Sequence, residues 1–193
     1  MARQAEMFSE EELVQRAKKG DRLAFGHLVE RYQDQVYALS CRTLGDPSRA
    51  EDVAQEAFIR AWKAMASFRG QSKFSSWLYR ITLNSSFSEL RRRGRPVDQL
   101  PQDELESLNV TGNSAEPFVS AIERRDLVEK LIQGLPPLYR SMVVLFYLQE
   151  LDCQEIATIL ERPVGTVKAY LHRARAQLRT GAEKLLQTGS SSK

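Results

Sequence analysis

Cationic side chains at helical spacing near the C-terminus are the residues of this chain best suited to bind a charged ligand. Lys168, His172, Arg175 and Arg179 recur at three- and four-residue steps, so a helix places them on one face. Apolar side chains recur at the same steps on the opposite face: Val164, Val167, Leu171, Ala174 and Leu178. A helix of this kind can enter a DNA groove and meet phosphates and base edges. A solvated basic face on an ordinary amphipathic helix explains the pattern equally well, so the rest of the chain must decide.

Patterns typical of enzymes and metal centres are missing from the sequence. His27 and His172 are the only histidines, and neither belongs to a zinc-binding motif. Phosphate-binding glycine loops and the GxSxG nucleophile motif are also missing. The two cysteines, Cys41 and Cys153, are far apart, and we expect them to be small buried helix residues. The sequence therefore predicts a protein that is not an enzyme and uses no cofactor or metal.

Composition predicts a folded protein that contacts no membrane. The chain has 193 residues, 42% of them hydrophobic, which suffices for one domain or two small ones. Its apolar runs stay below the roughly 18 residues that span a bilayer. The first residues lack the basic-then-apolar pattern of a secretory leader, so we expect a cytoplasmic protein.

The net charge of +3 is unevenly distributed along the chain. Residues 1–95 hold 17 Lys/Arg against 12 Asp/Glu, and residues 124–193 hold 11 against 7. Residues 96–123 hold 6 acidic residues and no Lys or Arg. Two basic bodies joined by an acidic segment predict two domains that bind a polyanion, with a linker that avoids it.

Domain boundaries follow from where helical periodicity stops. Asp, Glu, Asn, Ser, Pro and Gly dominate residues 96–118, which predicts a flexible acidic linker. We expect one helical domain over residues 1–95 and a second over 119–187. A polar, disordered tail is expected over 188–193.

The elements that position these residues are predicted to be helices throughout, which makes the fold class all-α. Capping boxes begin helices at Ser9 and Asp152, each with a glutamate three residues later. Gly45 ends a long second helix, and Pro47 begins a third. The inward faces of the second and third helices are expected to hold Phe25, Leu28, Tyr32, Val36 and Leu39, and Ala50, Val53, Ala57, Ala61 and Met65. The next helix runs from about Lys73 to the arginines at 91–95.

The two helices before the tail have the pattern of a helix-turn-helix. Ala157 is small where the helices would cross, and Ile156 and Leu160 would bury the first helix. The usual turn glycine is missing, since Glu161 and Arg162 occupy the turn.

Here the sequence resembles the sigma-70 family. The string Pro163-Val-Gly-Thr-Val-Lys168, the arginine-rich helix after it and residues 135–148 resemble region 4. Residues 25–32, 50–62 and 68–81 resemble region 2 independently. The organisation into two domains is similar to that of the extracytoplasmic-function (ECF) group. This resemblance implies an alternative sigma factor that reads −35 duplex and melted −10 DNA on core RNA polymerase.

The resemblance also implies a surface for the clamp helices of core polymerase on the third helix. An ordinary solvated face is the alternative, but Ile59 in its centre favours a protein contact. The expected docking residues are Asp52, Gln55, Glu56, Ile59, Arg60 and Lys63. Further implied partners are the polymerase flap and a cognate anti-sigma factor.

For the −10 element, the resemblance implies a loop from Phe68 to Phe74 that receives a flipped base, with Asn84 reading its edge. Aromatic, amide and cationic side chains in this stretch suit single-strand binding. Trp77 is expected to share a face with Arg80 and Asn84, and partial burial at the core edge is an equal alternative. The expected −10 residues are Phe68, Arg69, Ser72, Lys73, Phe74, Trp77, Arg80, Asn84, Arg91, Arg92 and Arg93.

For the −35 element, Lys168 is expected to contact base acceptors and Ala169 to approach a thymine methyl. The expected −35 residues are Thr166, Lys168, Ala169, Tyr170, His172, Arg173 and Arg175. Two other functions fit the same helices: a stand-alone helix-turn-helix regulator that binds duplex operator, and a helical adaptor without DNA contact.

Overall fold

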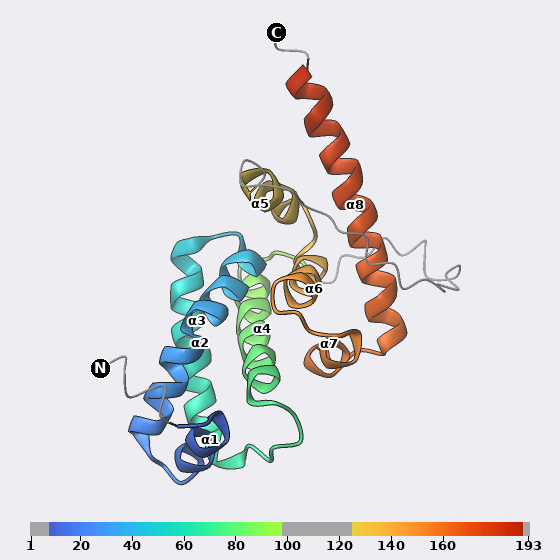
Figure 1. Ribbon diagram of the computed structural model, residues 1–193. Coiled ribbons are helices and arrows are strands. Elements are labelled where there is room, and N and C mark those ends of the chain that lie inside the picture. The colour runs from blue at the N-terminus through green and yellow to red at the C-terminus, as the bar shows by residue number, and fades with distance from the viewer. Residues whose placement is uncertain (1–7, 98–124, 191–193) are drawn as a thin grey trace. The chain divides into compact units, whose positions relative to one another are not determined.

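A computed structural model describes residues 8–97 and 125–190 of the chain. The chain divides into two compact units, Met1–Arg95 and Pro96–Lys193. All regular structure in the described residues is helical, as the sequence predicted (Figure 1). The predicted linker, apart from Pro96 and Val97, lies outside the described residues, and so do residues 119–124.

The first unit contains helices α1 (Glu10–Lys18), α2 (Arg22–Leu44), α3 (Pro47–Ala64) and α4 (Phe74–Arg92) and the short 3-10 helix η2 (Met65–Ser67). Helices α2, α3 and α4 pack against one another, and α1 packs on α2 and η2. The predicted inward faces of α2 and α3 are confirmed, because all ten named residues are buried. Burial of these apolar faces holds the bundle together.

Local signals in the sequence place the ends of these helices. Ser9 and Glu12 form the predicted capping box at the start of α1. Asp21 caps α2 by accepting hydrogen bonds from the backbone N–H groups of Leu23 and Ala24, at 3.0 and 3.1 Å. Gly45 ends α2 in the left-handed conformation with φ 69°, where a residue without Cβ avoids strain.

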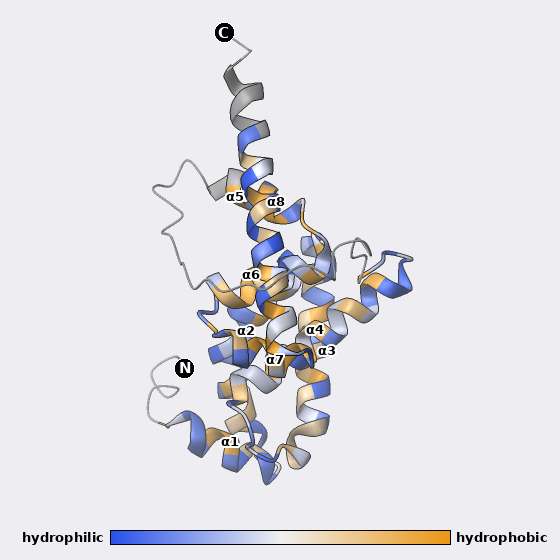
Figure 2. Cartoon of the chain, turned by 90° about the vertical axis from the view of Figure 1, so that its right-hand side faces the viewer, coloured by the Kyte–Doolittle hydropathy of each residue, from blue (hydrophilic) through white to orange (hydrophobic). Residues whose placement is uncertain are grey.

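The second unit contains α5 (Arg125–Gln133), α6 (Pro137–Tyr147), α7 (Cys153–Leu160) and α8 (Val164–Ser190). Helices α6, α7 and α8 pack together, and α5 packs on α6 and α8. Gly181 allows this approach, because a Cβ there would lie 2.8 Å from Cδ2 of Leu131. Figure 2 shows hydrophilic and hydrophobic segments alternating along α8, as expected of a helix with one packed face.

The structure differs from the sequence-based expectation in two details. Helix α8 continues to Ser190, so residues 188–190 of the expected disordered tail are helical. Cys41 and Cys153 are half-buried rather than buried. Cys153 is the first residue of α7, directly after the cap residue Asp152, which accounts for its partial exposure.

Candidate nucleic-acid interface

Four aromatic side chains form one cluster in the first unit: Tyr32, Phe68, Phe74 and Trp77. The Phe68 ring lies 4.9 Å from the Trp77 ring and 6.0 Å from the Phe74 ring, centroid to centroid. The Tyr32 ring lies 5.6 Å from Phe74. All four are buried, with Trp77 only 9% exposed. Of the two alternatives for Trp77, burial at the core edge is confirmed and a shared exposed face with Arg80 and Asn84 is wrong, because its indole completes this aromatic core.

The loop over residues 69–73 runs between two members of that cluster. Phe68 and Phe74 are the residues at its two ends, and both rings point into the core. Arg69 and Lys73 are exposed, and Ser72 is half-buried. The cluster therefore anchors the loop, while Gln71, which is also exposed, and these three polar residues face solvent with the loop backbone.

The solvent side of α4 carries the remaining polar candidates. Asn84 is exposed and Arg80 is half-buried. The carbonyl of Asn84 accepts a hydrogen bond from the Ser88 hydroxyl at 2.7 Å. The Asn84 side chain is accessible to an external partner, which is what reading a base edge requires.

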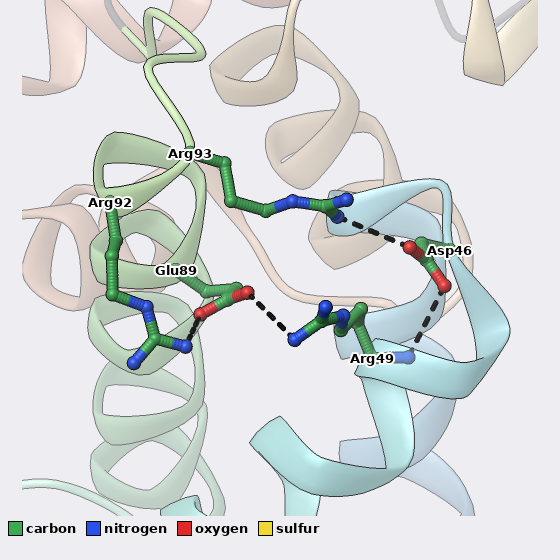
Figure 3. A network of polar contacts seen from close by, with 5 residues as sticks. All are labelled: Asp46, Arg49, Glu89, Arg92 and Arg93. Atoms are coloured by element: carbon green, nitrogen blue, oxygen red, sulfur yellow. Dashed lines mark hydrogen bonds and ion pairs between the residues drawn. The ribbon is translucent and has the colours of Figure 1, made fainter.

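Two of the expected −10 residues at the end of α4 are paired with carboxylates (Figure 3). Arg93 contacts Asp46 at 3.2 Å, and Arg92 pairs with Glu89. Arg49 lies 3.7 Å from the other oxygen of the buried Glu89 carboxylate. The backbone N–H of Arg49 and then the Arg93 guanidinium lower the pKa of Asp46 below its ordinary value. This network joins the C-terminal end of α4 to the N-terminal end of α3.

The predicted docking face of α3 is exposed. All six predicted residues are accessible, and Ile59 is 49% exposed among charged and amide neighbours. Glu56 and Arg60 form an ion pair at 2.7 Å along this face. A single exposed isoleucine is common on protein surfaces, so the docking role of this face stays a prediction.

In the second unit, α8 separates its apolar and basic faces as predicted. Val167, Leu171 and Ala174 are buried, whereas Lys168 and His172 are exposed. Thr166, Ala169, Arg173 and Arg175 are half-buried at the border between the two faces.

Tyr170 departs from the prediction. Its ring is 5% exposed and lies 5.4 Å from the ring of Tyr139 on α6. The predicted place of Tyr170 beside the groove-facing stripe is wrong, because the ring fills the space between α8 and α6. It can support the helix but does not reach a DNA groove in this structure.

The turn between α7 and α8 closes without glycine. Glu161 has φ 53° and ψ 44°, a left-handed conformation, and its backbone N–H donates to the carbonyl of Ala157. The backbone N–H of Arg162 donates to the same carbonyl at 3.0 Å. These two hydrogen bonds to one carbonyl end α7 and direct the chain into α8. The helix-turn-helix geometry therefore forms without a glycine in the turn.

Comparison with known proteins identifies both units. The chain matches Sigma-70 region 2 over residues 28–96 and Sigma-70 region 4 over residues 125–178. It is 40% identical over 174 residues to the ECF RNA polymerase sigma factor SigW of Bacillus subtilis, covering 86% of this chain and 92% of the relative. The chain belongs to the ECF group of the sigma-70 family. The resemblance seen in the sequence is thereby confirmed.

Further relatives cover nearly the whole sigma factor. The ECF RNA polymerase sigma-E factor of Escherichia coli K12 is 37% identical over 192 residues, covering 95% of this chain and 99% of the relative. The structure of CnrH in complex with the cytosolic domain of CnrY is similar with a TM-score of 0.65 at 26% identity. That match covers 91% of this chain and 97% of CnrH. The agreement extends across both regions and is not confined to the helix-turn-helix.

Sequence reasoning missed the contacts of α1, which precedes the match to region 2. The Tyr32 hydroxyl donates a hydrogen bond to the Glu10 carboxylate, 22 residues earlier in the chain. Glu10 lies in the first turn of α1, where helix capping already explains an acidic residue. No periodic signal links it to Tyr32, so only the folded structure reveals the pair.

Other kinds of site find no support in the described part of the chain. Within residues 8–97 and 125–190, no group of three or more His, Cys, Asp or Glu side chains could hold a metal ion. None of the described helices is both long and apolar enough to cross a membrane.

Proposed function

We propose that this ECF sigma factor binds core RNA polymerase and reads promoters with its two units separately. Residues 1–95 dock on the polymerase and hold the melted −10 strand, and residues 119–187 read the −35 duplex. The observation that carries the proposal is the pairing of two compact units with the two promoter-reading regions of one family.

Region 4 would read the duplex through the exposed face of α8. Lys168 and His172 are accessible near the N-terminal part of the helix, where recognition helices contact base edges. Ala169 lies beside them and is small enough to approach a thymine methyl. Thr166, Arg173 and Arg175, at the border of the face, are assigned to positioning contacts with phosphates. Buried Tyr170 is not proposed as a DNA contact.

Region 2 would hold the unpaired −10 strand at the 69–73 loop and along α4. Arg69 and Lys73 supply positive charge, and Ser72 and Asn84 supply hydrogen bonds to an exposed base edge. Phe68, Phe74 and Trp77 would shape the pocket from below rather than stack as exposed platforms. Arg80 and Arg91 are proposed as backbone contacts along the same helix.

Polymerase docking is assigned to α3. The exposed Ile59 would enter an apolar site on the clamp helices, with Asp52, Gln55, Glu56, Arg60 and Lys63 around it. Apolar centres with polar rims are typical of protein interfaces. The sigma factor would act by binding and not by catalysis of its own. The sigma factor would act in the cytoplasm, where polymerase and promoter DNA are found.

Regulation by an anti-sigma factor is part of the proposal. CnrH, which shares this two-region fold, was solved in complex with the cytosolic domain of a second protein, CnrY. We infer that a partner protein covers the docking and DNA-binding faces of this sigma factor until a signal releases it.

Run-off transcription tests the whole proposal. Purified sigma factor and competent core polymerase from a matching bacterium should start transcription at discrete sites on a library of promoter DNA. A stand-alone regulator would instead bind duplex operator tightly without polymerase, and a helical adaptor would be unaffected by charge reversal at Lys168 and Arg175. Failure to direct any specific start would overturn the proposal.

Asn84→Ala tests the assignment of the −10 strand on a promoter found in that way. Open-complex formation, followed by permanganate reactivity of unpaired thymines, should fall several-fold because a base-edge contact is lost. Binding to a −35 duplex should stay unchanged. Equal loss of both activities would show that Asn84 serves the fold instead.

A further inference from the structure

Helix α1 forms one wall of the core on which the 69–73 loop rests. Leu13, Val14 and Ala17 of α1 belong to the same buried cluster as Phe68, Phe74 and Trp77. Helix α1 also packs directly on η2, which leads into Phe68. The position of α1 therefore affects Phe68 and Phe74, the residues at the two ends of the loop.

Polar contacts fix α1 at its N-terminal end. The Ser9–Glu12 capping box sets the first turn, which holds Glu10 in place. The backbone carbonyl of Phe8 accepts a hydrogen bond from Arg31 of α2 at 3.3 Å, and the Arg16 guanidinium lies 4.8 Å from the centre of the Phe8 ring. The Arg31 hydrogen bond ties the start of α1 to the middle of α2, and the other contacts hold that start in place.

Glu10 links this start to the aromatic cluster. Its carboxylate accepts the hydrogen bond from the buried Tyr32 hydroxyl. Burial, and then the Glu10 carboxylate, raise the pKa of Tyr32 well above its ordinary value, so the hydroxyl keeps its proton and donates. Burial followed by the charge of Glu10 also raises the pKa of Tyr79, on α4, to about 12.

A continuous series of ring contacts connects Tyr32 to both ends of the 69–73 loop. The Tyr32 ring contacts Phe74, which contacts both Trp77 and Phe68. Phe68 precedes the loop and Phe74 follows it. A shift of the Tyr32 ring would therefore reach both ends of the loop through side chains that leave little free space.

We propose that α1 positions the single-strand-binding loop of region 2, and that Glu10 is the positioning residue, acting through Tyr32 and Phe74. This inference rests on the proposed function of the 69–73 loop. It assigns a role in −10 recognition to a helix that precedes the match to region 2. Glu10 itself touches no DNA in this account, since it holds the ring that frames the loop.

The test uses the full chain in holoenzyme and three substitutions. Glu10→Ala removes the acceptor, Glu10→Gln keeps an oxygen that can accept, and Tyr32→Phe removes only the hydroxyl. Leu39→Val is the matched control, because Leu39 is fully buried on the same face of α2 but lies about two turns away, outside this core cluster. The Leu39→Val variant should lower the stability of the first unit without changing a residue of the aromatic cluster.

The first measurement is affinity for two probes from a promoter found by run-off transcription: the single-stranded non-template −10 segment and the −35 duplex. Glu10→Ala and Tyr32→Phe should each weaken single-strand binding about tenfold, as expected for loss of a charge-assisted hydrogen bond. Duplex binding should stay within twofold. The double variant should be no weaker than either single variant, and Glu10→Gln should recover most of the affinity. Unchanged single-strand binding in Glu10→Ala, or an equal loss in Leu39→Val, would overturn the inference.

A second measurement separates this inference from the proposed function. In a Trp62→Phe background, Trp77 is the remaining tryptophan, and its fluorescence reports on the aromatic cluster without DNA. Acrylamide quenching of Trp77 should rise in Glu10→Ala and not in Leu39→Val, and equal quenching in the two would overturn the positioning role. If quenching rises while wild-type holoenzyme shows no preference for the −10 strand over a scrambled one, α1 still positions the cluster and the proposed −10 function fails.

Discussion

The two units of this sigma factor differ in where the arginines that hold the fold together lie relative to the predicted DNA surface. In region 2, Arg92 and Arg93 lie at a predicted DNA surface but pair with Glu89 and Asp46 (Figure 3). Among the described residues of region 4, Arg140 is a buried arginine, and it lies far in sequence from the exposed basic face of α8. Its guanidinium donates to the side-chain oxygen and the carbonyl of Gln133 and to the carbonyl of Leu135, each at 2.9 Å.

The difference shows that a cluster of cations does not by itself mark a DNA contact. Arg93 has a second role, because it ties the end of α4 to the cap residue of α3. Lys168 and His172 are exposed on a helix whose other face buries Val167, Leu171 and Ala174. We therefore expect region 4 cations on α8 to contribute to specificity, and the arginines of α4 to divide between folding and binding.

Removing the buried arginine should have the largest effect. Arg140→Ala leaves the carbonyl of Gln133, at the end of α5, and that of Leu135 without this donor, so the free energy of unfolding of the second unit should fall by about 2–4 kcal/mol. Thermal unfolding followed by circular dichroism measures this. Arg179→Ala, an exposed residue of α8, is the control and should stay within about 0.5 kcal/mol. Similar losses for both variants would remove the contrast between buried and exposed cations.

Lys168→Ala tests the specificity expected of the exposed face. Preference for the cognate −35 duplex over a single-base mismatch should fall by about 1–3 kcal/mol if Lys168 contacts a base. Competition binding with holoenzyme measures that preference. A uniform weakening on all sequences would instead place Lys168 on a phosphate.

The division among the α4 arginines is tested by salt dependence. Arg91 is exposed and donates only a long 3.4 Å bond to Ser88, whereas Arg93 pairs with Asp46. Arg91→Ala should reduce the slope of log affinity against log salt for single-stranded DNA by about 0.7. Arg93→Ala should leave the slope unchanged and cost at most about 1 kcal/mol of stability, since the pair is partly exposed. Equal slopes for the two variants would contradict this division.

The smallest expected effect concerns Tyr139, whose ring packs against Tyr170, a residue that was predicted to contact DNA. The buried hydroxyl of Tyr139, whose ring faces Tyr170, has no hydrogen-bond partner in the described structure. Tyr139→Phe should therefore stabilise the second unit by about 0.5–1 kcal/mol, because an unsatisfied buried group is removed. Chemical denaturation measures the gain. A loss of stability would mean that the hydroxyl has a bound water or another partner.

Much of the fold and part of the site could be predicted from the sequence. Capping boxes at Ser9 and Asp152 act within one helical turn, and the apolar periodicity of α2 and α3 describes single helices. Such signals depend on neighbours close in the chain, so the sequence carries them completely. The exposure of Ile59 on α3 and of Lys168 on α8 followed from the same periodicity.

Residues at the border between two helix faces could not be assigned in this way. Trp77 and Tyr170 each lie where periodicity allows either side, and both turn inward because an aromatic partner from another element receives them. The carboxylate partners of Arg93 and Tyr32 lie 47 and 22 residues away in the chain.

The sequence by itself determined the helices, their inward faces, the two-region organisation and the family. The tertiary structure alone decided which aromatic rings are buried, which arginines are held by carboxylates and how Glu10 reaches the aromatic cluster. The physical reason is that periodicity and capping are local, whereas packing and ion pairs depend on which distant side chains the fold brings within contact.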